Sequence, residues 1–120
     1  MFSLTASNRY WLCIGGVDMR KGFNSLCGVV RTTMNQDPLS GDVYIFINSN
    51  RTTIKLLHWE RGGLVIYHKR LEVGRFEMPK FNPNANSYSI SWSDLVVMIE
   101  GIGIDKKRCK KRFEKVGNSM

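Results

Sequence analysis

Residues 15–23 constrain the fold most, because a short apolar run ends there and an amphipathic helix is predicted to begin. The run at residues 10–14 is rich in strand formers and closes at two glycines, so it is predicted to be the first strand. Asp18 has the position of a helix N-cap, since its carboxylate can accept hydrogen bonds from the free N–H groups of a first turn. A strand followed by a helix over residues 18–34 is therefore expected.

Apolar residues recur at three- and four-residue spacing through this helix, which places them on one stripe. The stripe comprises Met19, Phe23, Leu26, Cys27, Val30 and Met34. The opposite side carries Arg20, Asn24 and Arg31. One face of the helix is therefore expected to pack on a core, and the other face is cationic.

Three later segments have the pattern of antiparallel hairpins. Residues 43–47 are continuously apolar and either β-branched or aromatic, which predicts a strand covered on both faces. Residues 53–59 and 64–71 are predicted to follow as two further strands, joined by a turn at 60–63. The expected fold class is α+β, with a small antiparallel β-meander, one N-terminal amphipathic helix and one short C-terminal helix.

The short C-terminal helix is predicted to begin after residues 88–90, which allow one more short strand. Ser91 and Asp94 have the spacing of a capping box, with Asp94 in place of the usual Glu or Gln. The apolar residues that follow are expected to dock this helix on the sheet, and a glycine to end it.

The length of 120 residues and the 42% hydrophobic content suffice for one modest core, so residues 1–104 are expected to form one domain. Residues 105–120 differ, since they hold seven of the 18 Lys and Arg residues and two of the ten Asp and Glu residues. They are expected to form a basic, flexible tail. A formal charge of +8 predicts a polyanionic partner, either nucleic acid or an acidic membrane surface.

Several protein classes are not expected. The three cysteines, Cys13, Cys27 and Cys109, are an odd number at wide spacing, which argues against a disulfide scaffold or structural zinc and fits a reducing cytoplasm. No signal peptide is recognised, and no stretch approaches the roughly 20 apolar residues of a membrane span. A soluble, cytoplasmic protein that does not act on membranes is expected, without metal or cofactor.

Catalysis is not expected either. Metal-dependent phosphoryl transfer needs two or three convergent carboxylates. Asp18 and Asp94 are interpreted as helix caps, and Asp37 and Asp42 as turn residues. The remaining carboxylates, which follow no recognisable pattern, are Glu60, Glu72, Glu77 and Glu100.

The hairpin predicts a cationic corner. In the expected register, Lys55 lies opposite His68 and Thr53 opposite Arg70, so Lys55, His68 and Arg70 come together at one end of the sheet. They are either solvated strand-end residues or a phosphate-binding corner. Aromatic residues interleave with these cations and are either core residues, the simpler explanation, or stacking platforms for a single strand.

Five motifs in this chain, taken in order, resemble a known family. They are VDMRKG at 17–22, DPLSG at 37–41, IKLLHW at 54–59, YHKRLE at 67–72 and GRF at 74–76. In sequence and order they are similar to the accessory proteins (TnpB, second open reading frame) of the insertion-sequence sixty-six transposon family. The resemblance covers residues 12–104. His58, His68 and the turn at 61–63 depart from the family pattern.

The resemblance implies a non-catalytic protein that is encoded beside a separate DDE transposase and is required with it for efficient transposition. The expected partners are transposon-end DNA and the transposase or other transposon-encoded proteins, and a homo-oligomer is allowed. The alternatives are a pure interaction module for the transposase or, less favoured, a small metal-dependent nuclease.

The predicted nucleic-acid-binding surface combines cations of the domain and the tail. Those of the domain are Arg20, Lys21, Lys55, Lys69, Arg70 and Arg75. Those of the tail, which lie beyond the family core and add affinity through charge alone, are Lys106, Lys107, Arg108, Lys110, Lys111 and Arg112. Such a run is as often only a solvated tail.

Overall fold

The computed structural model describes residues 4–78 and 87–100 of the chain. Five strands and two helices lie within these residues. In chain order they are β1 (Tyr10–Cys13), α1 (Phe23–Thr32), β2 (Val43–Ile47), β3 (Thr53–Glu60), β4 (Gly63–Arg70), β5 (Ser87–Ile90) and α2 (Trp92–Glu100). Neither helix is long and apolar enough to cross a membrane.

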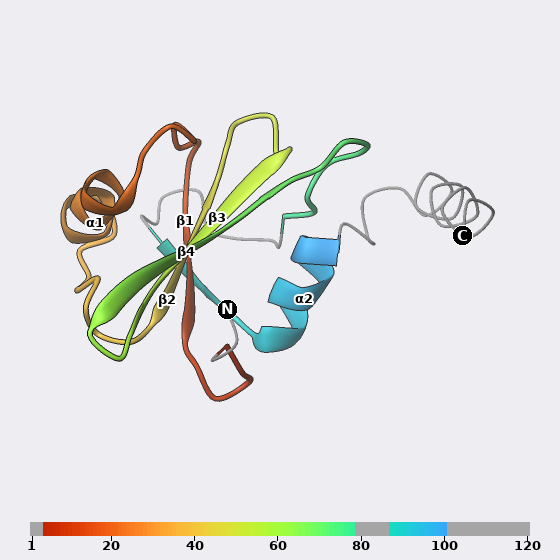
Figure 1. Cartoon of the computed structure of the whole chain (residues 1–120). Coiled ribbons are helices and arrows are strands. Elements are labelled where there is room, and N and C mark those ends of the chain that lie inside the picture. The colour runs from red at the N-terminus through yellow and green to blue at the C-terminus, as the bar shows by residue number, and fades with distance from the viewer. Residues whose placement is uncertain (1–3, 79–86, 101–120) are drawn as a thin grey trace.

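All five strands form one mixed sheet in the order β4-β3-β2-β1-β5 (Figure 1). Strand β1 is parallel to β2, with Tyr10 opposite Val43, and the other neighbouring pairs are antiparallel. The predicted fold class, a small antiparallel meander with an N-terminal helix, is therefore wrong. The expected first strand is present as β1, but it belongs to the same sheet as the hairpins. Helix α1 returns the chain across the sheet so that β2 starts beside the start of β1, which makes the pair parallel.

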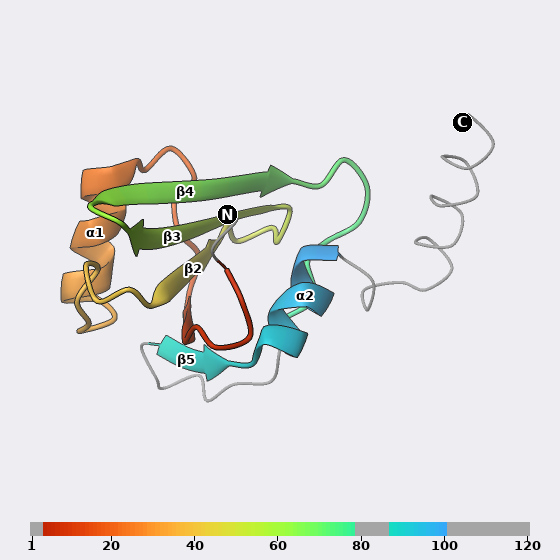
Figure 2. The same cartoon turned by 60° about the horizontal axis from the view of Figure 1, so that its bottom comes forward.

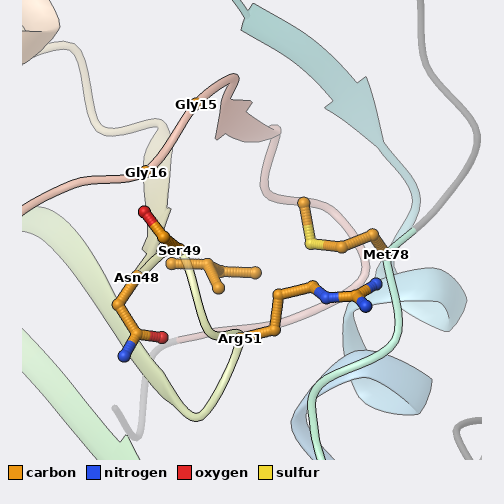
Figure 3. Close-up of a pocket in the computed structure, with 7 residues that line it drawn as sticks. Gly15, Gly16, Asn48, Ser49, Arg51 and Met78 are labelled. Carbon is orange, nitrogen blue, oxygen red and sulfur yellow. The ribbon is translucent and has the colours of Figure 1, made fainter.

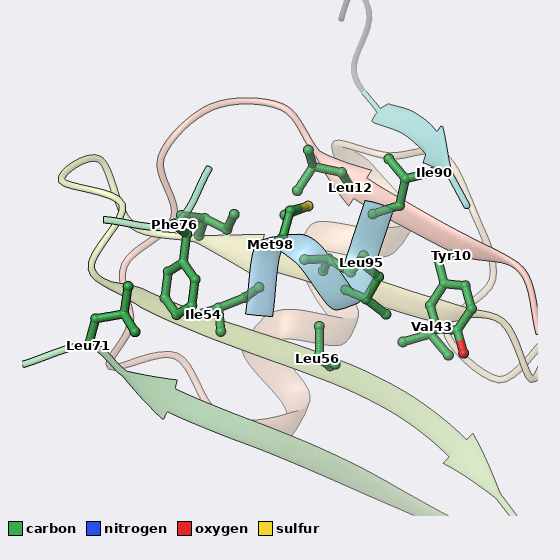
Figure 4. Close-up of a cluster of buried hydrophobic side chains, with 12 residues drawn as sticks. Tyr10, Leu12, Val43, Ile54, Leu56, Leu71, Phe76, Ile90, Leu95 and Met98 are labelled. Atoms are coloured by element: carbon green, nitrogen blue, oxygen red, sulfur yellow. The ribbon is translucent and has the colours of Figure 1, made fainter. Parts of the chain in front are cut away.

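The two helices cover opposite faces of the sheet (Figures 1 and 2). Strand β2 lies between them and is buried along its whole length, which confirms the prediction of a strand covered on both faces. Its residues Val43 and Ile45 belong to one core with Leu95 of α2 (Figure 4). Tyr44 and Phe46 belong to a second core with residues of α1. The predicted docking of α2 on the sheet is confirmed.

Helix α1 begins later than predicted. Its N-cap is Gly22, and the Asp18 carboxylate accepts a hydrogen bond of 2.9 Å from the backbone N–H of Arg20 instead. Asp18 thus closes a turn of its own before the helix, in which its carbonyl also accepts from the N–H of Lys21. The predicted cap of α2 is confirmed, since the N–H of Asp94 donates to Ser91 Oγ at 3.1 Å.

The predicted register of the β3–β4 hairpin is confirmed, with Lys55 opposite His68 and Thr53 opposite Arg70. Its turn has positive φ at Arg61 (49°) and at the glycine that follows (82°). Two successive positive φ values are typical of the type I′ turns that match the twist of paired strands.

Candidate nucleic-acid interface

Three segments far apart in the sequence meet at one end of the sheet: the β1–α1 loop (14–22), the β2–β3 turn (48–52) and the segment after β4 (71–78). They lie together at the top of Figure 1. Backbone hydrogen bonds join them, from Val17 N–H to the Ile47 carbonyl (3.2 Å) and from Phe76 N–H to the Arg51 carbonyl (2.6 Å). We call this end the cationic end, defined by Arg20, Lys21, Arg51, Lys55, Arg70 and Arg75.

Lys55 is the buried member of the cationic end. It projects from β3 on the face that α1 covers, and its side chain is shielded so well that the residue is only 8% exposed. Its Nζ donates a hydrogen bond of 2.8 Å to the carbonyl oxygen of Lys21. A buried ammonium needs such an acceptor. Lys55 therefore fastens the β1–α1 loop to the sheet. It was predicted to belong to an exposed binding surface, but it is buried.

The predicted cationic corner of Lys55, His68 and Arg70 is present at the β3–β4 end of this surface. The pKa of His68 is lowered, first by partial burial and then by the positive charges of Lys55 and Arg70. Since an unperturbed imidazole titrates near pH 6.5, His68 is neutral at pH 7. The corner therefore carries two positive charges at neutral pH rather than three.

Two exposed arginines of the cationic end are held by neighbouring carboxylates. Arg20 pairs with Asp18 at 2.8 Å, and Arg70 pairs with Glu72 at 3.3 Å. The hydrogen bonds from Arg20 lower the pKa of Asp18 to about 2. Exposed pairs of this kind contribute little free energy, because water and salt screen them. A phosphate can therefore compete with either carboxylate for its arginine.

Lys69 lies apart from the other predicted cations. It lies two residues after Tyr67 and therefore on the same face, which α2 covers. Its Nζ donates a hydrogen bond of 2.8 Å to the carbonyl oxygen of Ile99, in the last turn of α2. A cation at this position satisfies a free carbonyl and interacts favourably with the negative end of the helix dipole. Lys69 therefore anchors α2, whereas Arg70, the next residue, belongs to the opposite face.

Arg51 was not among the predicted site residues, although it lies in this surface. It is exposed in the β2–β3 turn with φ 58°, and the hydrogen bond from Phe76 N–H to its carbonyl puts it next to Arg75. The turn itself can be recognised in the sequence from its Asn and Ser residues. No sequence signal indicates which of its side chains faces the neighbouring loops.

The other end of the sheet has mixed charge. Asp42 accepts from Arg9 Nε (3.2 Å) and Trp11 Nε1 (3.0 Å), and His58 lies 3.1 Å from Glu60. Within residues 4–78 and 87–100, no three His, Cys, Asp or Glu side chains are placed to share a metal ion. The predicted tail cations lie outside the described residues.

The chain matches a known family over most of its length. A family model described as IS66 Orf2-like protein matches residues 8–109. The chain is also 31% identical over 94 residues to the uncharacterized protein y4hO of Sinorhizobium fredii, covering 78% of this chain and 80% of that protein. It is 29% identical over 96 residues to y4jC of the same organism, also uncharacterized, covering 80% and 79%. No solved structure matches.

Proposed function

Because this chain belongs to the IS66 Orf2-like family of transposon accessory proteins, we propose that it acts in transposition by binding DNA through its cationic end. It positions DNA for the transposase and catalyses no reaction of its own. The tail cations, from Lys106 to Arg112, add phosphate contacts to those of the folded domain.

The observation that carries this proposal is that three separate segments, each with an exposed arginine, meet at one end of the sheet. Arg20 comes from the β1–α1 loop, Arg51 from the β2–β3 turn, and Arg75 from the segment after β4. Of the carboxylates at this end, Asp18 and Glu72 already pair with arginines, and Glu77 has its Oε2 buried. Six cations against these three carboxylates leave this end with a positive net charge.

Lys55 contributes indirectly to this surface. By holding the Lys21 carbonyl at 2.8 Å, it fixes the loop that presents Arg20 and Lys21. A preformed cationic loop loses less conformational entropy when it binds a phosphate backbone.

A salt titration of DNA binding tests the proposal. Full-length protein is titrated with a transposon-end duplex and with a scrambled duplex, and the slope of log affinity against log salt is measured. The double variant Arg70→Gln, Arg75→Gln is expected to have a shallower slope, reduced in magnitude by about 0.9 for each phosphate that it no longer neutralises. Arg61→Gln, which removes an exposed arginine from the other end of the sheet, is the matched control. Equal slopes for the wild type, the double variant and the control would contradict DNA binding at the cationic end.

A second candidate function is binding of the transposase through α2. Its outer face exposes Val96 (38%) and Val97 (42%), and exposed apolar side chains on one helix face favour a protein partner. Binding of the purified transposase by Val97→Asn is then expected to be weaker than wild type. Val73→Asn is the control, because Val73 has the same 42% exposure but is not part of α2.

A further inference from the structure

A pocket of about 300 Å³ opens within the cationic end. The loop after β1, the β2–β3 turn and the segment after β4 enclose it, through Gly15, Gly16, Ile47, Ser49, Arg51 and Met78 (Figure 3). We propose that this pocket holds one unstacked nucleobase of a DNA strand whose phosphates lie on the surrounding arginines. This inference rests on the proposed function and adds a base-binding site to it.

The side chains of the pocket suit a base. Ile47 and Met78 supply apolar surface, and the Arg51 side chain extends across the pocket toward Met78 (Figure 3). A nucleobase has apolar faces and a polar edge, and a guanidinium can stack on the first or donate hydrogen bonds to the second. Within the described part of the chain, no carboxylate pairs with Arg51. Its guanidinium is therefore available to a ligand.

The walls of the pocket are built before any ligand arrives. A Cβ atom added at Gly16 would strike Ser49 Oγ, so the β1–α1 loop approaches the turn as closely as a glycine permits. Within the turn, Asn48 Oδ1 accepts from the N–H groups of Thr52 (2.9 Å) and Thr53 (3.0 Å). The Asn48 carbonyl accepts from Arg51 N–H at 3.0 Å. These bonds fix the backbone that aims Arg51.

A base fits this pocket better than a phosphate does. The lining has one cationic side chain, Arg51, and its polar side chains Asn48 and Ser49 are neutral. The pocket therefore offers a phosphate little positive charge, whereas Arg70 and Arg75 lie outside it. Arg75 lies next to the pocket because Phe76 N–H donates to the Arg51 carbonyl at 2.6 Å. A strand can therefore place a phosphate on Arg75 and its base against Arg51.

The test compares two labelled single strands of equal length, one of thymidines and one with abasic sites that keep every phosphate. The full chain is expected to bind the thymidine strand about tenfold more tightly at the same salt concentration, a typical gain for one buried base. Arg51→Gln should abolish this preference. Arg61→Gln should keep it, because Arg61 is also an exposed arginine with positive φ but lies in the other turn.

The outcomes separate this inference from the proposed function. Failure to bind either single strand at low salt would overturn the base site, and failure to bind the duplexes of the salt titration as well would overturn the proposed function. Equal binding of the two strands would overturn the base site and leave phosphate binding intact. Arg51→Lys keeps the charge, so it should retain the salt slope and lose the preference for bases. If Arg51→Lys or Arg51→Gln keeps a tenfold preference, Arg51 does not contact a base and the inference is wrong.

Discussion

The Nζ atom of Lys55 donates a hydrogen bond of 2.8 Å to the carbonyl oxygen of Lys21 and thereby joins strand β3 to the β1–α1 loop. Lys55→Met keeps the length of the side chain and removes the donor, which leaves this carbonyl without its partner. We expect the free energy of unfolding to fall by about 1–3 kcal/mol in urea titrations. Lys21→Met is the control, because Lys21 contributes only its backbone to this bond. An equal decrease for both variants would contradict the assignment.

Lys69 and Arg70 are adjacent residues with opposite expected roles, because successive side chains of a strand point to opposite faces. Lys69→Met removes the hydrogen bond to Ile99 and should lower the free energy of unfolding by about 1 kcal/mol with an unchanged salt slope of DNA binding. Arg70→Gln should change the slope and leave the unfolding free energy within about 0.5 kcal/mol. A reduced salt slope with Lys69→Met would place this residue in the DNA interface after all.

The predicted site shows what periodicity can and cannot supply. The short turn at 60–63 predicted the hairpin register correctly. Alternation of side chains along β4 then places Lys69 on the opposite face of the sheet from Lys55 and Arg70. Grouping all six cations on one surface ignored that period. The conformation of Arg51 leaves no such trace, because a positive φ at a non-glycine residue depends on the bonds that Asn48 makes in the folded turn.

The fold was predicted in its elements and not in their arrangement. A continuously apolar β2 indicated cover on both faces, which is the property of a strand inside a sheet. Its neighbour β3 follows through a short turn and was predicted from hairpin signals. Its other neighbour, β1, is set by long-range contacts, since the chain passes through α1 before β2 joins β1. The prediction that Asp18 caps the helix was wrong, because an Asp that caps a helix and an Asp that closes a turn to residue i+2 have the same appearance in sequence.

The pair of Asp18 and Arg20 makes DNA binding sensitive to a carboxylate. Asp18→Asn removes the negative charge beside Arg20, so we expect tighter DNA binding, a few-fold at low salt, and a steeper salt slope. In the wild type the carboxyl should titrate near pH 2 by NMR, since its pKa is lowered to about 2. Its stabilising effect on the turn is complete above the unfolded pKa of about 4 and is lost as the pH falls toward 2. Weaker DNA binding by Asp18→Asn would show that the turn matters more than the charge.

His68 gives the protein a pH dependence in a higher range. Because its pKa in the folded state is lowered by burial and by Lys55 and Arg70, protonation favours the unfolded chain. The stability that the neutral imidazole allows is complete above about pH 6.5 and decreases as the pH falls below that value. The urea midpoint of the wild type should therefore drop between pH 7.5 and pH 5.5 by more than that of His68→Gln. Parallel curves for the two proteins would exclude His68 as the source.

The contact of Gly16 with Ser49 sets the shape of the pocket and can be tested by a double-mutant cycle. Gly16→Ala introduces a Cβ that collides with Ser49 Oγ, so we expect a decrease of about 1–3 kcal/mol in the free energy of unfolding. Ser49→Ala alone should change it by less than about 0.5 kcal/mol, since Ser49 is exposed. Combined with Gly16→Ala, Ser49→Ala removes the colliding oxygen and should restore much of the stability, which appears as a coupling energy in the cycle.

Gly28→Ala is the matched control for that cycle. A Cβ at Gly28 meets nothing within 4 Å, and the residue lies inside α1, where alanine is more favourable than glycine. This variant should therefore stabilise the protein by about 0.5–1 kcal/mol. Decreases of similar size at Gly16 and Gly28 would point to a general cost of replacing glycine. Additive effects of Gly16→Ala and Ser49→Ala would show that the two residues do not touch.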